Sequence, residues 1–506
     1  MEEPIMKKMM NINTVHEILQ KDLKVFESLE DMEVTPDLFE SWKTRIQKIS
    51  SIDFELAMEN VKDIYLILKN WNTQVENLME TLMIDGSTVS STMFPDYAFL
   101  IGLHCTHTDA DGLGGFLPGT LVDMISYWDE TIPNSFTLVS ACAEYKSNSL
   151  ILLNAILFKM IFDQDPARFF ITDIAMDLST YQDLCKLYPN LQGVDKIDKS
   201  HYFDVSSDEF DFVYVDHHTT NPWIASTTVD CAGIFVAPTL KDFNKYNVTP
   251  KYESSEYLIY KEDTKISATY IMGLLMMDIL EDVVWDSITP ARETTASRIA
   301  DHVMDRFCAL IRAISDWDTF EWRDHPSESY GEFEPTDIGN LGFTKSPVLC
   351  FNDVIKCIWY QADCALQYLR VFPDSIIDDM KTAKVVNKAV TSQCLGKGKW
   401  MTIPELPEIE NWFVVGFPTI GIASMICHYI AQSENYKARN TVSSCGIIML
   451  DLYSSTVSFR TTETSNTCRV DAIAKRYGGG GHPQASGCRN KDLSDLLKAK
   501  LLEQTC

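Results

Sequence analysis

Phe99-Leu100-Ile101-Gly102-Leu103, followed by Thr106-His107-Thr108-Asp109-Ala110-Asp111-Gly112, is the stretch on which the fold of this chain depends. The first run is apolar and predicts a buried strand. In an extended backbone, residues i, i+2 and i+4 project to one side, so His107, Asp109 and Asp111 are predicted to share a face where that strand ends. Two carboxylates beside an imidazole suit Mn²⁺, Mg²⁺ or Fe²⁺ better than zinc. Taken alone, the run is equally compatible with a solvated turn, because Asp, Thr and Gly are common turn residues.

The same pattern occurs twice more along the chain. Residues 169–172 form an apolar run that ends at Asp173, and residues 212–215 form another that ends at Asp216, His217 and His218. In an open parallel sheet, ligands collect outside the carboxyl ends of the strands. The three segments are therefore predicted to bring carboxylates and imidazoles into one metal site.

A fourth motif lies near the C-terminus, at Gly478-Gly479-Gly480-Gly481-His482-Pro483-Gln484-Ala485-Ser486-Gly487. Together with the three strand ends, it resembles the motifs of the DHH phosphoesterase superfamily and its DHH-associated C-terminal domain. The resemblance extends from about Phe99 to the C-terminus, and residues 107–109 and 317–322 are most similar to the oligoribonuclease, or nano-RNase, branch. It implies an α/β protein with a doubly wound, mostly parallel catalytic sheet and a smaller α/β domain that binds substrate.

The resemblance also implies a site for two divalent metal ions, with Mn²⁺ preferred and Mg²⁺ or Fe²⁺ as alternatives. The implied ligands are His107, Asp109, Asp111, Asp173, His217 and Asp318. Asp173 would bridge the two ions, and Asp318 is preferred to Asp316 because the family pattern is Asp-Thr followed by an aromatic residue. Two such ions polarise a phosphoryl group and lower the pKa of a water between them.

Two further residues are assigned catalytic roles. Asp216 is expected to accept hydrogen bonds that orient the histidines rather than to ligate a metal. His218 is expected to contact the scissile phosphate. For a single imidazole a buried structural role is the usual explanation, but two adjacent histidines at the end of an apolar strand favour a site.

The C-terminal motif is expected to bind the phosphate that is not cleaved. Successive glycines let backbone amides approach an anion closely, and an arginine can grip a phosphate with two hydrogen bonds. The implied substrate-binding residues are Arg460, Gly479, Gly480, Gly481 and His482.

Charge limits the kind of substrate. The 506 residues include 72 acidic and 43 basic side chains, a net charge of −29. Such a charge repels a long polyanion unless a local basic or metal-lined site overrides it. A short oligonucleotide or nucleotide is therefore the expected substrate, and long duplex nucleic acid is not expected.

The cysteines and the apolar runs indicate where the protein works. The 14 cysteines are scattered without paired CxxC spacing, which favours reduced, buried thiols over disulfides or a zinc module. No apolar run approaches the length of about 18–20 residues that spans a bilayer. A cytoplasmic protein without a membrane partner is predicted.

The chain is predicted to contain four parts. Residues 1–92 form a helical region, 93–371 the DHH catalytic domain, 372–398 a linker and 399–506 the substrate-binding domain. Residues 222–265 are interpreted as an insertion without an assigned role. In the helical region, apolar residues recur at three- and four-residue steps between 61 and 82, which predicts a long amphipathic helix. Packing within its own core is preferred, and a homodimer or partner interface through these helices is the alternative.

The sequence thus predicts a metal-dependent phosphodiesterase that hydrolyses very short oligonucleotides to mononucleotides. A 3′-phosphoadenosine 5′-phosphate phosphatase, a cyclic or linear dinucleotide phosphodiesterase and a non-catalytic nucleotide sensor stay open. A RecJ-type exonuclease is disfavoured by the charge, and a type II pyrophosphatase by the glycine-rich motif. The cleavage polarity and the preference for RNA or DNA stay open as well.

Overall fold

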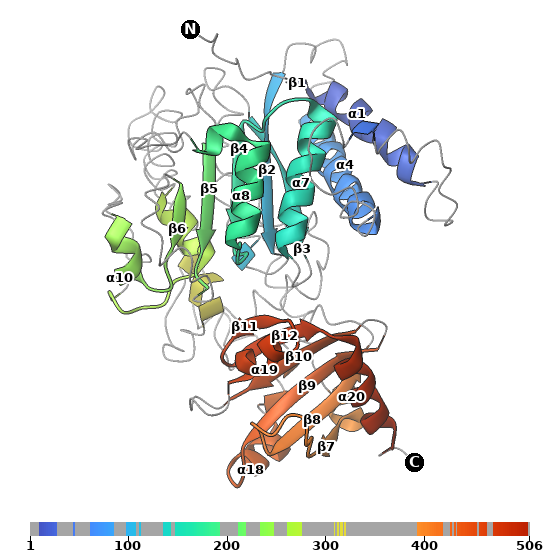
Figure 1. Ribbon diagram of the computed structural model, residues 1–506, viewed down its shortest axis with the longest axis vertical. Helices are drawn as coiled ribbons and strands as arrows, with labels where there is room; N and C mark the ends of the chain where they lie inside the picture. The colour runs from blue at the N-terminus through green and yellow to red at the C-terminus, as the bar shows by residue number, and fades with distance from the viewer. Residues whose placement is uncertain are drawn as a thin grey trace. The chain divides into compact units, whose positions relative to one another are not determined.

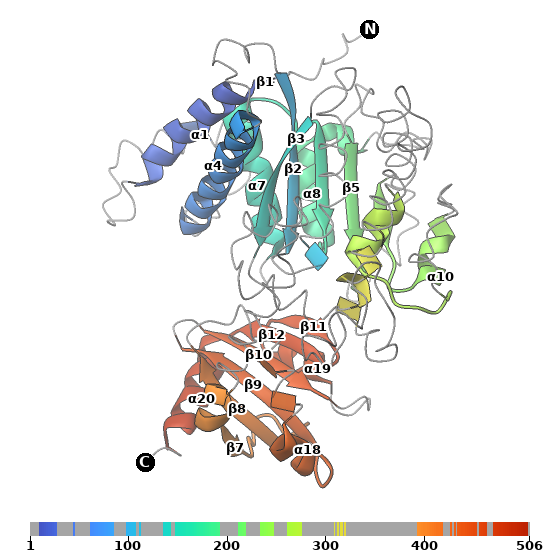
Figure 2. The same cartoon turned by 180° about the vertical axis from the view of Figure 1, so that it is seen from behind.

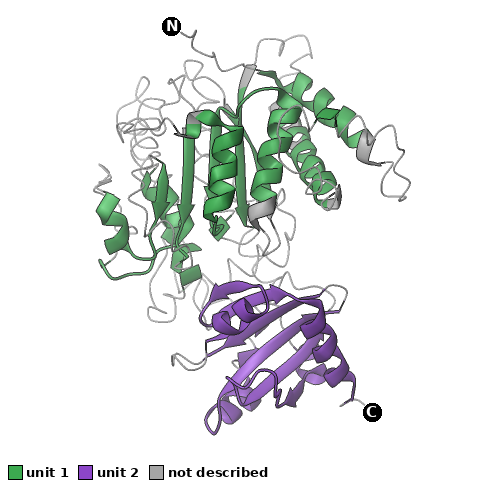
Figure 3. Ribbon diagram, viewed as in Figure 1, with its two compact units in different colours: residues 1–339, 346–348, 361–372 green, residues 340–345, 349–360, 373–506 purple. Residues whose placement is uncertain are grey.

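The computed structural model describes residues 10–27, 44–45, 61–84, 98–107, 111–112, 135–142, 147–192, 211–218, 233–246, 261–275, 308, 311–312, 314–316, 318–319, 392–417, 426–427, 430–431, 433–452, 455–462 and 469–503. The chain forms two compact units (Figure 3). The first comprises residues 1–339, 346–348 and 361–372, and the second comprises 340–345, 349–360 and 373–506. Each unit has its own β-sheet and is described separately.

The first unit is built on five parallel strands (Figure 1). Their order is β3-β2-β4-β5-β6, and a short strand, β1 (Met10–Asn11), joins the start of β2 in the antiparallel sense. The strands are β2 (Ala98–His107), β3 (Ser135–Cys142), β4 (Arg168–Thr172), β5 (Asp211–Asp216) and β6 (Ile234–Val236). The predicted α/β fold with a parallel sheet is confirmed, and its strand order reverses direction between β2 and β4, where such sheets bind ligands.

Two helices cover one face of this sheet (Figures 1 and 2). Helix α7 (Ser147–Phe162) precedes β4 in the sequence, and α8 (Leu178–Leu187) follows it. The short helix η1 (Pro189–Gln192) comes directly after α8. Helix α8 begins where the Asp177 side chain accepts a hydrogen bond from the amide of Thr180, a common N-terminal cap. All five residues of β4 are buried, as expected for a central strand of a parallel sheet.

The N-terminal helices belong to the same core. Helix α1 (Ile12–Glu27) packs against α4 (Val61–Ile84), as predicted from the apolar spacing. Ile64, Leu68, Trp71 and Val75 on α4 are buried, and the Trp71 ring lies 6.4 Å from the ring of Phe158 on α7. These four residues of the apolar stripe of α4 are therefore buried inside the chain.

Both edges of the parallel sheet are closed by a side chain. On β3, the amide of Val139 donates to Gln74 Oε1 at 2.8 Å, and the Gln74 amide donates back to the Val139 carbonyl. On β6, the amide of Val236 donates to the Tyr246 hydroxyl, which donates to the Val236 carbonyl. An open strand edge invites pairing with another chain, so these contacts blunt both edges at these two positions.

Replacing Gln74 with leucine should destabilise the first unit. The change leaves the buried Val139 amide without its acceptor, and a buried unsatisfied group costs about 1–3 kcal/mol. We expect the midpoint of urea denaturation to fall, while Gln182→Leu at an exposed position of α8 leaves it nearly unchanged. Equal midpoints for the Gln74 variant and the wild type would contradict this role.

The stretch interpreted as an insertion contributes to the sheet. Strand β6 lies within residues 222–265 and pairs in parallel with β5. It is followed by α10 (Leu240–Phe243) and the short helix η3 (Asn244–Tyr246). The interpretation of residues 222–265 as an insertion missed β6, because a strand of three residues is too short to show an alternating pattern in the sequence.

The second unit contains a six-stranded mixed sheet, as the predicted second α/β domain requires (Figure 1). Its order is β11-β12-β10-β9-β8-β7, and only β8 and β9 are parallel among the described pairs. The strands are β7 (Lys399–Met401), β8 (Asn411–Phe417), β9 (Cys445–Asp451), β10 (Thr456–Thr461), β11 (Gly480–His482) and β12 (Ala485–Arg489).

Alternation along the strands divides the second unit into two apolar layers. Val414 and Ile448 face a core that includes α19 (Val470–Arg476) and α20 (Lys491–Glu503), whereas Phe413 and Ile447 face a core that includes α18 (Glu434–Asn440). Successive strand residues point to opposite faces, so both faces of this sheet are covered.

The predicted linker is partly structured. Residues 392–397, at the end of the segment 372–398, are helical, and Cys394 lies in the core beside α18. The helix was not predicted because it is short, contains Gly396 and buries a single side chain, so no periodic pattern is visible.

The seven cysteines whose side chains the structure describes are free and buried, in agreement with the prediction of reduced thiols. Within the described residues, no helix combines the length and the apolar character that crossing a bilayer requires.

Candidate metal centre

The predicted ligands of the first unit lie at the carboxyl ends of neighbouring parallel strands. His107 is the last residue of β2, Asp173 follows β4, and Asp216 ends β5 immediately before His217. His107 is half-buried and is in none of the candidate metal-binding groups found among the described residues. Asp109 lies outside the described residues.

Three carboxylates converge on one nitrogen atom at the centre of this site. His217 Nε2 lies 3.1 Å from Asp318 Oδ2, 3.2 Å from Asp173 Oδ1 and 3.6 Å from Asp111 Oδ2. His217, Asp111 and Asp173 are buried, and the side chain of Asp318 is 18% exposed. Asp111 and Asp318 are more than 200 positions apart in the sequence, and the fold brings both of them to His217.

This arrangement concentrates negative charge away from water. Carboxylates that share a buried space repel one another strongly. Burial on its own lowers the pKa of His217, but hydrogen bonds to Asp173 and Asp318 and the charges of Asp318 and Asp111 raise that pKa well above its usual value. The three carboxylates thus favour a positive charge at this position, where a bound cation would balance them.

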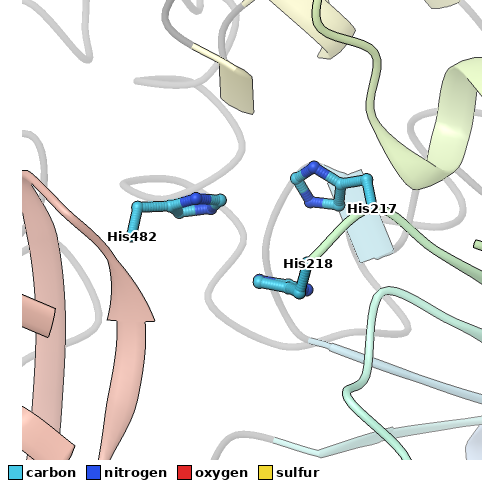
Figure 4. Close-up of side chains that lie close together, drawn as sticks. All are labelled: His217, His218 and His482. Carbon is cyan, nitrogen blue, oxygen red and sulfur yellow. The ribbon is translucent and has the colours of Figure 1, made fainter. Parts of the chain in front are cut away.

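The second histidine is oriented by Asp216 (Figure 4 shows the imidazoles of His217 and His218). Asp216 Oδ1 accepts from His218 Nδ1 at 2.7 Å and from the His218 amide at 3.1 Å, and Asp216 Oδ2 accepts from the Tyr214 hydroxyl. Burial alone raises the pKa of Asp216, but His218 and His217 lower it below its usual value. Asp216 is thus an ionised acceptor that fixes the ring of His218.

Asp111 is held by the start of a helix. Both of its carboxylate oxygens accept backbone hydrogen bonds at 2.9 Å, from Ala268 and from Thr269, and the Thr269 hydroxyl donates to the Asp111 carbonyl. The helix begins immediately after Ser267, whose hydroxyl accepts from the amide of Tyr270, a common arrangement for a serine N-cap. The free amides at a helix N-terminus favour a carboxylate, so this helix fixes the position of Asp111.

The structure distinguishes between Asp316 and Asp318, the two aspartates considered for the last ligand position. Asp318 contacts His217, whereas Asp316 is buried 3.7 Å from the Arg312 guanidinium. Asp318 is therefore the one placed with Asp111 and Asp173.

Asp173 has an unusual backbone conformation. Its φ is +56°, one of two positive values among the described non-glycine residues, and its amide donates to the Val215 carbonyl at 3.0 Å. Left-handed conformations are unfavourable for most L-residues and gather at functional sites. This conformation places the Asp173 carboxylate 3.2 Å from His217 and 3.7 Å from His218 Nδ1.

The donor set fits divalent metal ions. Asp111, His217 and Asp318 offer ligand atoms within 4.8 Å of one another, and so do Asp173, Asp216 and His218, although Asp216 and His218 are already hydrogen-bonded to each other. Carboxylate oxygens with one imidazole each suit Mn²⁺, Mg²⁺ or Fe²⁺. The same site without a cation would leave several buried carboxylates close together, which is costly.

Behind the site lies a buried histidine that the sequence analysis did not single out. His104 is on β2, and its Nε2 lies 2.7 Å from the hydroxyl of Thr172, the residue before Asp173. Burial lowers the pKa of His104 from 6.5 to about 3. Its position within an apolar strand could have drawn attention to it, but the sequence carries no signal for its partner on β4.

The low pKa of His104 predicts that acid destabilises the protein. The folded state binds fewer protons than the unfolded state between the two pKa values, so the stability present above pH 6.5 is lost as the pH falls towards 3. Linkage gives a loss of about 2 kcal/mol between pH 6.5 and pH 4.5 from this residue. Urea denaturation at several pH values should show that His104→Gln has a shallower dependence; equal slopes would contradict the assignment.

In the second unit, two predicted substrate-binding residues lie in one row of the sheet. Arg460 on β10 is opposite Ala485 on β12, and Ala485 is opposite His482 on β11. Directly opposed residues share a face of the sheet, so Arg460 and His482 flank the small side chain of Ala485. The Arg460 guanidinium donates to the carbonyls of Phe459 and Ser486, which fixes its position.

The four glycines at 478–481 belong to two different structural elements. The amides of Gly478 and Gly479 donate to carbonyls of Lys475 and Ala474 at the end of α19. Gly480 and Gly481 belong to the edge strand β11 with His482. A Cβ atom at 479 would collide with the Gly487 carbonyl oxygen, so this glycine is required for close packing. Of the three glycines expected to bind phosphate, Gly479 therefore already uses its amide at the end of α19.

The chain is similar to known proteins in structure but matches none of those compared in sequence. No family model and no curated protein sequence matches the chain. Among solved structures, it is similar to exonuclease RecJ bound to manganese, with 13% identity and a TM-score of 0.38 over 79% of this chain and 89% of that chain. It is similar to the DHH domain of a member of a family of ribosomal proteins, with 11% identity and a TM-score of 0.44 over 92% and 97% of the two chains.

A further match is a pGpG-specific phosphodiesterase from Vibrio cholerae, with 11% identity and a TM-score of 0.27 over 80% of this chain and 98% of that chain. The chain has the predicted α/β architecture, with aspartates and histidines at the ends of its parallel strands and a mixed sheet in a second unit.

Proposed function

We propose that this protein is a divalent-metal-dependent phosphodiesterase that hydrolyses very short oligonucleotides to mononucleotides. The observation that supports it is the convergence of three carboxylates on His217 at the ends of parallel strands. Metal ions bound there would neutralise phosphoryl charge and lower the pKa of a water molecule. We propose His107, Asp109, Asp111, Asp173, His217 and Asp318 as the ligands, and Mn²⁺ as the metal, with Mg²⁺ or Fe²⁺ as alternatives.

Two residues of the first unit act on the substrate without being metal ligands in this proposal. His218 contacts the scissile phosphate, and Asp216 keeps its ring in place by accepting the Nδ1 proton. With Nδ1 bound to Asp216, Nε2 is the ring nitrogen that points away and can reach a phosphate oxygen.

The second unit supplies a place for one further phosphate. Arg460 and His482 lie on one face of the sheet with β12 between their strands. Two strand spacings put their backbones roughly 10 Å apart. The backbone of Gly480 and Gly481 lies close to His482 on β11. One arginine and one histidine match a single phosphate group. With a net charge of −29, longer strands would gain repulsion but few new contacts, which supports a short substrate.

The same residues would serve a 3′-phosphoadenosine 5′-phosphate phosphatase or a dinucleotide phosphodiesterase. The test is hydrolysis by the full chain with Mn²⁺ of a series of end-labelled substrates, from 3′-phosphoadenosine 5′-phosphate and pGpG to pentanucleotides and a 24-mer. We expect the highest kcat/KM at two to five nucleotides. A maximum at the bisphosphate, or a strong preference for pGpG over the other short oligonucleotides, would replace the proposal by that activity, and bound Mn²⁺ without turnover of any substrate would support a sensor.

A further inference from the structure

A single buried hydroxyl connects three segments that carry the candidate metal ligands. Thr172 Oγ1 lies 2.7 Å from His104 Nε2, 2.9 Å from Thr106 Oγ1 and 3.3 Å from the Gly112 carbonyl oxygen. Thr172 precedes Asp173, Thr106 precedes His107, and Gly112 follows Asp111. His104, Thr106 and Thr172 are fully buried, so water does not replace these contacts.

Proton counting assigns a direction to each hydrogen bond. The Thr172 hydroxyl has one proton, and the Gly112 carbonyl can only accept. The Thr172 hydroxyl directs that proton towards Thr106 Oγ1 and the Gly112 carbonyl, so its contact with His104 is satisfied when it accepts from His104 Nε2. His104 is then the neutral tautomer that carries its proton on Nε2, in agreement with the lowered pKa.

Space around Gly112 is as restricted as the hydrogen bonding. A Cβ atom at 112 would lie 2.5 Å from the His107 carbonyl oxygen and 2.6 Å from Thr106 Oγ1. Gly112 therefore lies directly against Thr106 and His107. A shift of the Thr172 hydroxyl would affect both Gly112 and Asp173, whose left-handed backbone needs support from its surroundings.

We propose that His104 is a positioning residue, which acts through the Thr172 hydroxyl to hold the segments of His107, Asp111 and Asp173 in the register that binds metal. This inference rests on the proposed metal-dependent function and adds a residue that touches neither metal nor substrate. Hydrogen-bond partners of metal-ligand segments change metal affinity by about 10–100-fold when they are lost.

The test compares His104→Gln with His104→Leu in the full chain. Glutamine can place an amide donor near the position of Nε2, whereas leucine fills the space without a donor. We expect the Kd for Mn²⁺, measured by titration calorimetry, to rise at least tenfold for His104→Leu and less than threefold for His104→Gln. Thr172→Val should weaken Mn²⁺ binding like His104→Leu, and the double variant should be no weaker than either single variant.

Thr137→Val is the matched control, because Thr137 is a buried threonine of the neighbouring strand β3 outside these contacts. It should bind Mn²⁺ like the wild type even where its urea midpoint falls. Wild-type Mn²⁺ affinity in a folded His104→Leu variant, or equal losses for His104→Leu and Thr137→Val, would overturn the proposal. A wild-type protein that binds no Mn²⁺ would instead refute the proposed function itself.

Discussion

Asp173→Asn is expected to reduce kcat on the order of 10³-fold, the largest loss of any single change in the first unit. Asp173 is the carboxylate that contacts both histidines, and we propose that it bridges the two metal ions. Removing its charge weakens both metal sites at once, so Mn²⁺ affinity should fall with activity. Steady-state kinetics at saturating Mn²⁺ and calorimetric titration of the metal measure the two effects.

Asparagine is the suitable replacement because it tolerates the left-handed backbone of residue 173 better than other non-glycine residues. Losing one of several crowded carboxylates also relieves repulsion, so the free energy of unfolding should change by less than about 1 kcal/mol. Asp165→Asn, at a partly exposed residue paired with Lys159, is the control and should keep full activity. Wild-type turnover in a folded Asp173→Asn protein would refute the metal assignment.

The strand ends could be predicted from the sequence because their physical cause is local. An apolar run followed by His, Asp or both, as at residues 99–112, 169–173 and 212–218, is visible within a window of a few residues. A parallel sheet then places the carboxyl ends of its strands together. This reasoning anticipated that Asp173 and His217 approach each other, as they do at 3.2 Å.

Contacts between distant segments could not be predicted in the same way. The bonds from Ala268 and Thr269 to Asp111, and from His104 to Thr172, join positions 157, 158 and 68 residues apart. Each residue alone is an ordinary helix start or a buried strand residue. The use of Gly478 and Gly479 to terminate α19 was missed for a related reason, since a glycine run looks the same whether its amides face an anion or a helix end.

Arg460→Ala should raise KM for a dinucleotide by about 10–100-fold. Hydrogen bonds from a charged donor contribute roughly 1.5–3 kcal/mol, and the carbonyls of Phe459 and Ser486 already hold the guanidinium in place. Because Arg460 belongs to the second unit, the Kd for Mn²⁺ should stay at the wild-type value. Steady-state kinetics on an end-labelled dinucleotide, with a parallel Mn²⁺ titration, separates the two quantities.

Two companion variants make the Arg460 result specific. Arg460→Lys keeps the charge but loses the planar pair of donors, so its KM should lie between those of the wild type and Arg460→Ala. Arg489→Ala removes an exposed arginine at the end of the neighbouring strand β12 and should leave KM unchanged. If Arg489→Ala raised KM as much as Arg460→Ala, the effect would be one of overall charge; if Arg460→Ala weakened Mn²⁺ binding, the separation of phosphate binding from metal binding would fail.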